Sequence, residues 1–402
     1  MFVSKEHHPQ VLDRACYHSQ QQFDKELAEL FLPSWHCVAV RSELPRDGAF
    51  VTLELFGNPI ILWRKEGQVH AFLNVCAHRY STLTHAACGV VDRLKCKYHG
   101  WEYDQTGNVR RIPDARCFRP LEPGMLGLRQ YRAALCGELI FVSLADEPPS
   151  LREFLGPAFD TYADWFTPEM HTATVCDRVI DANWKVLVEN ALESYHTTEV
   201  HPKTFGEAPA EEDCTHELHE RSTSLTVSYE HERSFRQKLD GFGHWLVGLS
   251  PQRRYSHIVH YPNVMLSQLS LYRWVECIVP ISPTQSRSVV RVMCHIGRPG
   301  SMRRLWNRRL ISRWANTFLM QVGAEDEAVL PGVQRGLSAV DQPLGGLIST
   351  REERVVHFQN YVQASLPAEP QPAAARKPLV AETIAPPLHP HESPNGNHAH
   401  RG

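Results

Sequence analysis

Two short segments in the first quarter of the chain each carry one cysteine and one histidine. Cys76 and His78 stand in CAHRY, and Cys96 and His99 stand in CKYHGWEYDQTG. Two thiolates and two imidazoles suit either zinc or a [2Fe–2S] cluster. Common zinc fingers present two cysteines and then two histidines, whereas here each segment offers one of each. This order predicts a cluster in which one iron is bound by both cysteines and the other by both histidines. Structural zinc is the alternative.

A second group of polar residues lies in DANWKVLVENALESYHTTEVHP, residues 181–202. Apolar side chains recur at helical intervals from Trp184 to Tyr195, which predicts a helix with one buried face. Either Asp181 or Asn183 can cap the start of this helix.

Two histidines near the end of that helix are candidate metal ligands. Glu193 and His196 share the polar face, whereas five helical steps rotate His201 by about 140° from His196. Pro202 follows His201, and the residue before a proline avoids the helical conformation, so the helix should break before His201 and let it lie beside His196. Two histidines and one carboxylate form the facial triad of non-haem Fe(II) oxygenases. A solvated, charged helix face is the alternative on spacing alone.

Taken together, these two groups resemble the Rieske-type non-haem iron oxygenases, the terminal oxygenase alpha subunits of ring-hydroxylating systems. The resemblance rests on CAHRY…CKYHGWEYDQTG and NWKVLVEN…ESYHTTEVH and covers residues 12–366. It implies an α+β fold in which an all-β Rieske domain is inserted in a helix-grip catalytic domain, with assembly as a head-to-tail homotrimer. The family pattern has a small residue where Tyr80 stands, so we expect altered packing behind the first loop without the loss of a ligand.

The resemblance also implies the ligands of a mononuclear iron. His196 and His201 match the two histidine ligands. The third ligand is sought in GAEDEAVLPGVQRGLS, residues 323–338. Asp326 matches the family's ligand position, Glu325 is the alternative ligand, and an ordinary acidic helix surface is the alternative to a site.

Glu193 matches a catalytic acidic position of the family. By resemblance it bridges an iron-ligand histidine and the second cluster histidine, here His99, across a subunit boundary. Aromatic dioxygenases more often carry aspartate there, and glutamate resembles the subgroup that acts on quaternary ammonium compounds.

The substrate is expected to be betaine- or choline-like, with hydroxylation or oxidative demethylation as the reaction. An aromatic ring-hydroxylating dioxygenase is the alternative. A cage of aromatic side chains can hold a trimethylammonium group by cation–π contact. Candidates in the segment 203–275, each of which can equally be a core residue, are Phe205, Trp245, Tyr255, Tyr261, Tyr272 and Trp274.

Electrons are expected to come from a partner protein. No G-x-G-x-x-G loop follows a strand and no flavin motif is evident, so a separate reductase should oxidise NAD(P)H, with or without a ferredoxin. The [2Fe–2S] cluster would pass electrons singly to the mononuclear Fe(II), which activates O₂ next to the substrate. A non-catalytic Rieske electron-transfer protein is a second alternative, against which His196, His201 and Asp326 argue.

The pattern of elements predicts four parts. Residues 1–34 are an N-terminal helical segment of the catalytic domain. Within residues 15–35 we predict a helix that Pro33 ends, followed by the start of a strand. Short strands and turns over 35–145 predict the Rieske domain, and the hairpin signals FGN and KEGQ lie within it. Mixed helices and strands over 146–366 predict the catalytic domain. The tail, 367–402, is rich in Pro, Ala and His and is expected to be disordered.

Composition limits the remaining possibilities. The 402 residues are 42% hydrophobic and 22% charged, with a formal net charge of −3. This balance gives no basic field for nucleic acid. No apolar run predicts a membrane span or a signal peptide, so a cytoplasmic protein is the expectation.

Overall fold

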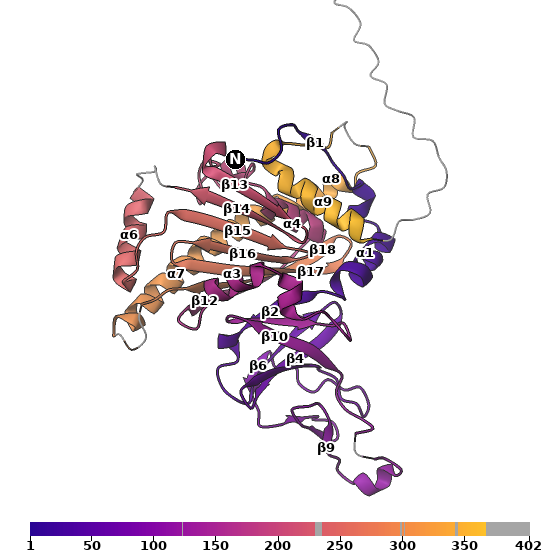
Figure 1. Cartoon of the computed structure of the whole chain (residues 1–402). Coiled ribbons are helices and arrows are strands. Elements are labelled where there is room, and N and C mark those ends of the chain that lie inside the picture. The colour runs from indigo at the N-terminus through magenta and orange to yellow at the C-terminus, as the bar shows by residue number, and fades with distance from the viewer. Residues whose placement is uncertain (123, 230–234, 298–299, 301, 342–344, 367–402) are drawn as a thin grey trace, which may run out of the picture. The chain divides into compact units, whose positions relative to one another are not determined.

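The computed structural model describes residues 1–366 except 123, 230–234, 298–299, 301 and 342–344, and residues 1–366 form one unit. The predicted disordered tail, 367–402, lies outside the described residues. Two seven-stranded antiparallel sheets dominate the fold (Figure 1). This arrangement confirms the predicted α+β class. No helix in the described part combines the length and apolar character needed to cross a bilayer.

The first sheet belongs to the predicted β-region. Its order is β2-β11-β10-β5-β4-β3-β6. The strands are β2 (Trp35–Val40), β3 (Ala49–Leu55), β4 (Asn58–Lys65), β5 (Gln68–Leu73), β6 (Cys88–Val90), β10 (Gln130–Cys136) and β11 (Leu139–Ser143). A separate three-stranded sheet is made of β7 (Leu94–Lys95), β8 (Glu102–Tyr103) and β9 (Val109–Arg111). Both predicted hairpins form, and their paired positive φ angles at Phe56–Gly57 and Glu66–Gly67 match the turn that favours glycine in second place.

The second sheet carries the catalytic region. Its order is β12-β18-β17-β16-β15-β14-β13. The strands are β12 (His171–Ile180), β13 (Cys214–His219), β14 (Ser222–Ser228), β15 (Arg254–His260), β16 (Val264–Leu269), β17 (Tyr272–Ser282) and β18 (Gln285–Cys294). A short pair, β1 (His8–Pro9) and β19 (Leu347–Ile348), joins the two ends of the described chain.

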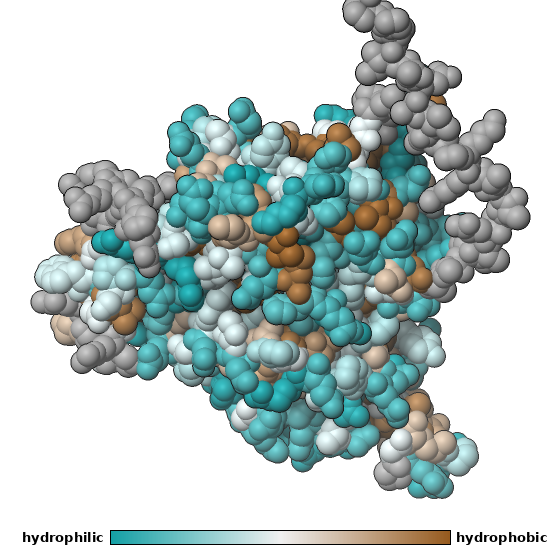
Figure 2. All heavy atoms as spheres, turned by 45° about the horizontal axis from the view of Figure 1, so that its top comes forward, coloured by the Kyte–Doolittle hydropathy of each residue, from teal (hydrophilic) through white to brown (hydrophobic). Residues whose placement is uncertain are grey.

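Helices surround the second sheet (Figure 1). They are α1 (Gln20–Glu26), α2 (Leu151–Leu155), α3 (Ala158–Trp165), α4 (Trp184–Leu192), α5 (Thr197–Val200), α6 (Phe235–Val247), α7 (Arg303–Glu327), α8 (Leu330–Leu337) and α9 (Glu353–Ser365). On the face drawn in Figure 2, hydrophilic side chains prevail and apolar side chains lie in separate groups.

The N-terminal residues pack into the catalytic region, as expected for an inserted Rieske domain. Tyr17 and Phe31 share a core cluster with Trp184 of α4 and Phe358 of α9. The single helix predicted over 15–35 was wrong in detail. A 3₁₀ turn, the short helix α1 and a π turn follow one another there, because Ser19 caps a new helix in the middle of the segment.

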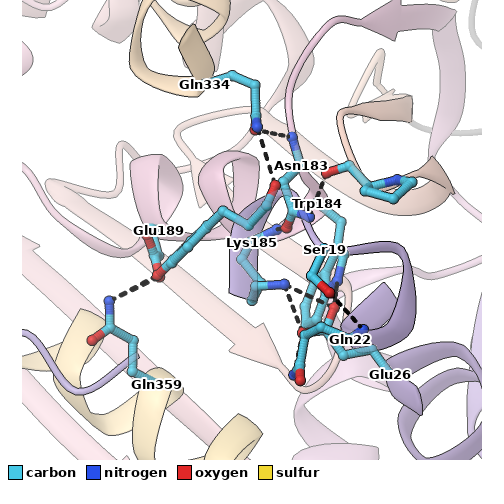
Figure 3. Close-up of polar contacts among 11 residues, drawn as sticks. Ser19, Gln22, Glu26, Asn183, Trp184, Lys185, Glu189, Gln334 and Gln359 are labelled. Carbon is cyan, nitrogen blue, oxygen red and sulfur yellow. Dashed lines mark hydrogen bonds and ion pairs between the residues drawn. The ribbon is translucent and has the colours of Figure 1, made fainter. Parts of the chain in front are cut away.

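A buried ion pair anchors α4 to α1 (Figure 3). The Lys185 ammonium lies 2.7 and 2.8 Å from the two carboxylate oxygens of Glu26, and the Trp184 indole donates to the same carboxylate at 2.7 Å. Both charged side chains are buried. Burial lowers the pKa of Lys185, and the Glu26 charge opposes that shift. The charged form of each side chain is therefore stabilised in the interior by the opposite charge of the other.

Further polar contacts fix the two ends of α4 (Figure 3). Asn183 caps the start of the helix, as predicted, by accepting from the Lys185 amide, and its own amide donates to Gln334 at 2.8 Å. Glu189 accepts from Tyr17 at 2.6 Å and from Gln359 at 3.0 Å. Helix α4 is thus held from the N-terminal segment, α8 and α9.

We expect Lys185→Met to lower the free energy of unfolding by about 3–5 kcal/mol, because the Glu26 carboxylate would be left buried without its cation. Adding Glu26→Gln should restore most of the loss, since the amide oxygen still accepts from Trp184. Chemical denaturation measures both variants. The matched control is Arg152→Met, which removes an exposed pair with Asp160 (3.1 Å) and should cost less than about 1 kcal/mol. A double variant no more stable than Lys185→Met would contradict the pairing argument.

Candidate metal centres

The first Cys/His loop leaves β5 and turns back through a compact hydrogen-bonded frame. The Cys76 amide donates to the carbonyl of Ser81 at 2.8 Å, and the Tyr80 amide donates to the carbonyl of Cys76 at 3.0 Å. Tyr80 has φ +58°, a left-handed conformation that a side chain tolerates poorly. Its side chain is 83% exposed. It therefore points away from the loop, and the expected change of packing behind the loop was wrong.

The second loop, between β7 and β8, repeats the same frame. The Cys96 amide donates to the carbonyl of Trp101 at 2.9 Å, and the Gly100 amide donates to the carbonyl of Cys96 at 2.9 Å. Gly100, with φ +74°, takes the left-handed place that Tyr80 holds in the first loop. The two loops are therefore equivalent clamps, which explains why each contributes one cysteine and one histidine.

The four predicted cluster ligands converge between these loops. The Cys76 and Cys96 side chains are each 1% exposed, whereas His99 is exposed. The rings of His78 and His99 lie 4.6 Å apart between centroids, and His78 stacks on Trp101 at 4.8 Å. The Nδ1 atom of His78 is buried without a hydrogen-bond partner. An unpaired buried nitrogen in a loop that also carries a buried thiol fits a [2Fe–2S] cluster as the missing partner.

Tyr103 contacts the predicted cluster ligand Cys76, which the sequence alone did not predict. Its hydroxyl lies 3.0 Å from the Sγ of Cys76 and accepts from the Ala77 amide at 3.1 Å. Burial raises the pKa of the Cys76 thiol, and the Tyr103 hydrogen bond opposes that shift. The phenol thus stabilises negative charge on the sulfur, which is the charge that a metal-bound thiolate carries.

Tyr103→Phe should keep the cluster but lower its reduction potential. The hydroxyl stabilises the more negative, reduced state, and the loss of about 1 kcal/mol corresponds to roughly 40 mV for one electron. A redox titration of the purified protein measures the shift. Tyr80→Phe, at an exposed position near the same cluster, is the control and should leave the potential unchanged. An unchanged potential in Tyr103→Phe would show that the hydroxyl does not act on the sulfur.

The segment that carries the second pair of histidines is not one continuous helix. Helix α4 ends at Leu192, and Glu193 is extended with φ −130° and ψ 166°. The helix predicted to run through Tyr195 was therefore wrong, and Tyr195 is 65% exposed instead of buried. His196 and His201 flank the separate short helix α5. The predicted break thus occurs earlier than Pro202 requires.

This break brings three predicted ligands together. The donor atoms of His196, His201 and Asp326 all lie within 4.8 Å of one another. The Nε2 atom of His201 is 3.2 Å from Oδ1 of Asp326. Asp326 comes from the last turn of α7, more than a hundred residues away. Two imidazoles and a carboxylate in one cluster fit Fe(II), although their role as ligands stays a prediction.

Glu325 occupies a different place beside the same histidine. Its carboxylate lies 2.9 Å from Nδ1 of His201 and accepts from the Thr204 hydroxyl at 2.6 Å. A carboxylate on the far ring nitrogen fixes the ring and leaves Nε2 for a metal. Of the two acidic residues left open by the sequence, the geometry favours Asp326 as ligand and Glu325 as the group that orients His201.

Glu193 has the corresponding relation to His196. One carboxylate oxygen contacts Nδ1 of His196, and the other accepts from the amides of Tyr195 and His196. Asn190, which the sequence analysis missed, donates to Oδ1 of Asp326 at 3.0 Å. Asn190 lies on α4, about one helical turn before Glu193, and this spacing could have indicated that it faces the same site. An amide side chain alone, however, does not indicate that it binds a ligand carboxylate.

The predicted aromatic cage forms only in part. Phe205 lies next to the site, with ring-centroid distances of 5.3 Å to His201 and 5.5 Å to Phe318. Trp245 is 66% exposed on α6, and Tyr261 is buried in the core against α9. These two belong to other parts of the molecule.

Asp326→Ala should abolish mononuclear iron binding, whereas Glu325→Gln should retain iron with roughly 10- to 100-fold lower affinity. The physical reason is that the first variant removes a ligand and the second loosens the orientation of one. Iron content after dialysis against graded chelator measures both. Equal iron loss from both variants, or stronger loss from Glu325→Gln, would reverse the two roles.

Comparison with known families matches both regions. Residues 34–132 match the Rieske [2Fe–2S] domain, and residues 159–368 match the ring hydroxylating alpha subunit (catalytic domain). The second match alone covers more than half of the chain.

Individual proteins similar to this chain are oxygenases. The glycine betaine monooxygenase oxygenase subunit of Chromohalobacter salexigens is 35% identical over 193 residues, 48% of this chain and 43% of that protein. The chain thus spans less than half the length of that relative. The chloroplastic choline monooxygenase of Spinacia oleracea is 26% identical over 353 residues, 86% of this chain and 75% of the relative. The crystal structure of the quaternary ammonium Rieske monooxygenase CntA with L-carnitine has the same fold, with a TM-score of 0.71 at 20% identity over 90% of this chain and 96% of that one.

Proposed function

The chain belongs to the ring-hydroxylating alpha-subunit family, and on that basis we propose that it is a terminal oxygenase acting on a betaine- or choline-like substrate. The observation that carries the proposal is the cluster of His196, His201 and Asp326 in a chain that also matches the Rieske [2Fe–2S] domain. An electron-transfer protein needs no such second cluster. The glycine betaine and choline monooxygenases among the relatives support the substrate class.

The two cofactors supply one-electron transfer and O₂ activation, and a separate NAD(P)H reductase, with or without a ferredoxin, supplies the electrons. For a trimethylammonium substrate, one oxygen atom enters a methyl group and the other leaves as water, with two electrons and two protons consumed. The hydroxymethyl group then loses its hydroxyl proton and leaves as formaldehyde, while the electron pair of the broken C–N bond stays on the nitrogen of the tertiary amine.

The chain's own residues position these centres. Glu325 holds Nδ1 of His201, and Glu193 holds Nδ1 of His196, so both imidazoles present their other nitrogen to one site. Phe205 packs edge-to-face against His201 and places an apolar ring on that side of the site. Tyr103 acts on the sulfur of Cys76 at the other centre.

A second copy of the chain completes the electron path in this proposal. Among the described residues, the side-chain hydrogen bonds of Glu193 go to His196 and to the amides of Tyr195 and His196, and none goes to the Rieske loops. A head-to-tail homotrimer would bring His99 of a neighbour to the Glu193 carboxylate. The exposure of His99 allows such a contact.

The test is turnover of the purified protein with a generic reductase, NADH and O₂. Glycine betaine, choline and benzoate are compared, and formaldehyde and hydroxylated products are measured. We expect formaldehyde from a quaternary ammonium compound and none with His196→Ala, which loses a ligand. Product from benzoate alone would favour an aromatic ring-hydroxylating oxygenase, and product from His196→Ala would exclude this iron site.

Glu193→Gln should keep both metal centres and the oligomer but slow electron transfer between them. Glutamine accepts at only one end, so its amide nitrogen would face an N–H donor at one of the two histidines. Single-turnover kinetics from fully reduced protein with substrate and O₂ measure cluster oxidation. Glu199→Gln, at an exposed position on α5, is the control. Cluster oxidation at the wild-type rate in Glu193→Gln would exclude the bridge.

A further inference from the structure

Arg354, at the start of α9, is a buried cation with unsatisfied hydrogen-bonding capacity. Its side chain is 0% exposed. Its Nε donates to the Thr223 hydroxyl at 3.2 Å and its Nη2 donates to Nδ1 of His257 at 3.3 Å. Its Nη1 is buried without a hydrogen-bond partner. A buried donor with no acceptor is costly, so this nitrogen points to an acceptor that none of the described residues provides.

The guanidinium also lacks a carboxylate. Among the ion pairs of the described residues, none includes Arg354, whereas buried Lys185 is paired with Glu26. The adjacent Glu353 is engaged elsewhere, because it accepts from the amides of Val3 and Ser4 and contacts His216. Burial lowers the pKa of Arg354 to about 10, so it remains charged at neutral pH. A buried, unpaired cation is unfavourable for folding, which suggests a role in binding.

Arg354 lies over the helix-covered face of the second sheet. Its two partners stand on β14 and β15. Strand register places His257 beside Ser267 on β16 and Ser267 beside Trp274 on β17, and cross-strand neighbours share a face. Tyr255 lies on the same face, two residues before His257, with its ring 6.1 Å from that of Trp274. A polar and aromatic row therefore leads from Arg354 to β17.

An acidic side chain stands at the other end of this row. Glu276 follows Trp274 on the same face of β17, and its carboxylate accepts from the Ser288 hydroxyl at 2.5 Å. Burial raises the pKa of Glu276 to about 7, and the charge of Asp326 adds to that shift. Glu276 is thus close enough to the mononuclear site to feel the charge of its carboxylate ligand candidate.

The Arg354 guanidinium and the ionised form of Glu276 together have the polarity that complements a zwitterion. His257, which holds Arg354, and Glu276 lie two strands apart across the sheet and two residues apart along it. A strand spacing of about 4.8 Å and a rise of about 3.4 Å per residue separate their backbones by roughly 12 Å. Allowing ~3–4 Å for contact at each end leaves roughly 5 Å for the ligand between its own two charged groups, which suits a compact molecule.

We propose that Arg354 binds the carboxylate of a compact zwitterionic quaternary ammonium substrate, whose cationic nitrogen lies against Trp274 and Glu276. This rests on the proposed function and deepens it, because it selects the betaine class over choline. With the carboxylate held at Arg354, the methyl groups face the end of the row nearest Asp326, where oxidation would occur.

The test compares glycine betaine, choline and acetate as ligands of the oxidised holoenzyme by titration calorimetry, followed by KM and kcat with a reductase. Arg354→Met should weaken betaine binding by roughly 10- to 100-fold, the loss of a charge-assisted hydrogen bond, and change choline binding less than about threefold. Glu276→Gln should weaken betaine and choline alike. Arg354→Lys should recover part of the betaine affinity.

Controls separate binding from folding. Arg351→Met, whose side chain bonds to the Pro209 carbonyl, should leave all three affinities unchanged. Arg354→Met should melt no earlier than wild type, since no carboxylate loses its partner. If Arg354→Met fails to fold, two other measurements test the carboxylate site: the betaine affinity of Arg354→Lys, and the preference of the wild-type protein for betaine over choline.

Three results would overturn the inference: wild type that binds choline as tightly as betaine, an Arg354→Met variant that weakens both ligands equally, or one that weakens neither. These differ from failure of the proposed function, in which wild type oxidises no quaternary ammonium compound. In that case acetate binding decides. Loss of acetate affinity in Arg354→Met but not in Arg351→Met would still support a carboxylate site at Arg354. Equal acetate affinity in the two variants would exclude that site.

Discussion

The position at which α4 ends is the constraint on which the mononuclear site depends. The buried pair of Lys185 and Glu26 fixes the start of the helix, and contacts to Glu189 fix its last turns. Because the chain becomes extended at Glu193, His196 and His201 leave the helix axis and meet a carboxylate from α7. A continuous helix would separate the two histidines. The anchoring residues therefore position the candidate iron site although none of them touches it.

Unpaired buried polar atoms identify where this chain needs an external partner. Most buried polar groups in a folded protein are hydrogen-bonded, so an exception calls for an explanation. Among the described residues, Nδ1 of His78 lacks a partner in the region of the two Rieske loops, and Nη1 of Arg354 lacks one above the second sheet. The first is explained by a cluster that the family contains. The second is explained by a carboxylate in the substrate that we propose.

The sequence predicted the residue groups better than the elements that position them. Cys76, His78, Cys96 and His99 could be recognised because soft ligands at fixed spacing are rare by chance, and the structure brings them together. The end of α4 could not be predicted, because Tyr195 continues the apolar period and only the exposed environment of its side chain shows that the helix has stopped. Long-range contacts carry even less local signal. Arg354, for example, becomes informative only once it is known that no carboxylate of the described residues pairs with it.

If one chain holds two different iron centres, its metal stoichiometry will show both of them. Protein purified without oxygen should contain three irons and two acid-labile sulfides per chain, and its reduced cluster should give the spin signal of a histidine-ligated [2Fe–2S] centre. Cys96→Ser should lose the sulfide and two irons and keep the third if the catalytic region still folds. Zinc in place of iron, or no labile sulfide in the wild-type protein, would exclude a Rieske cluster in this chain.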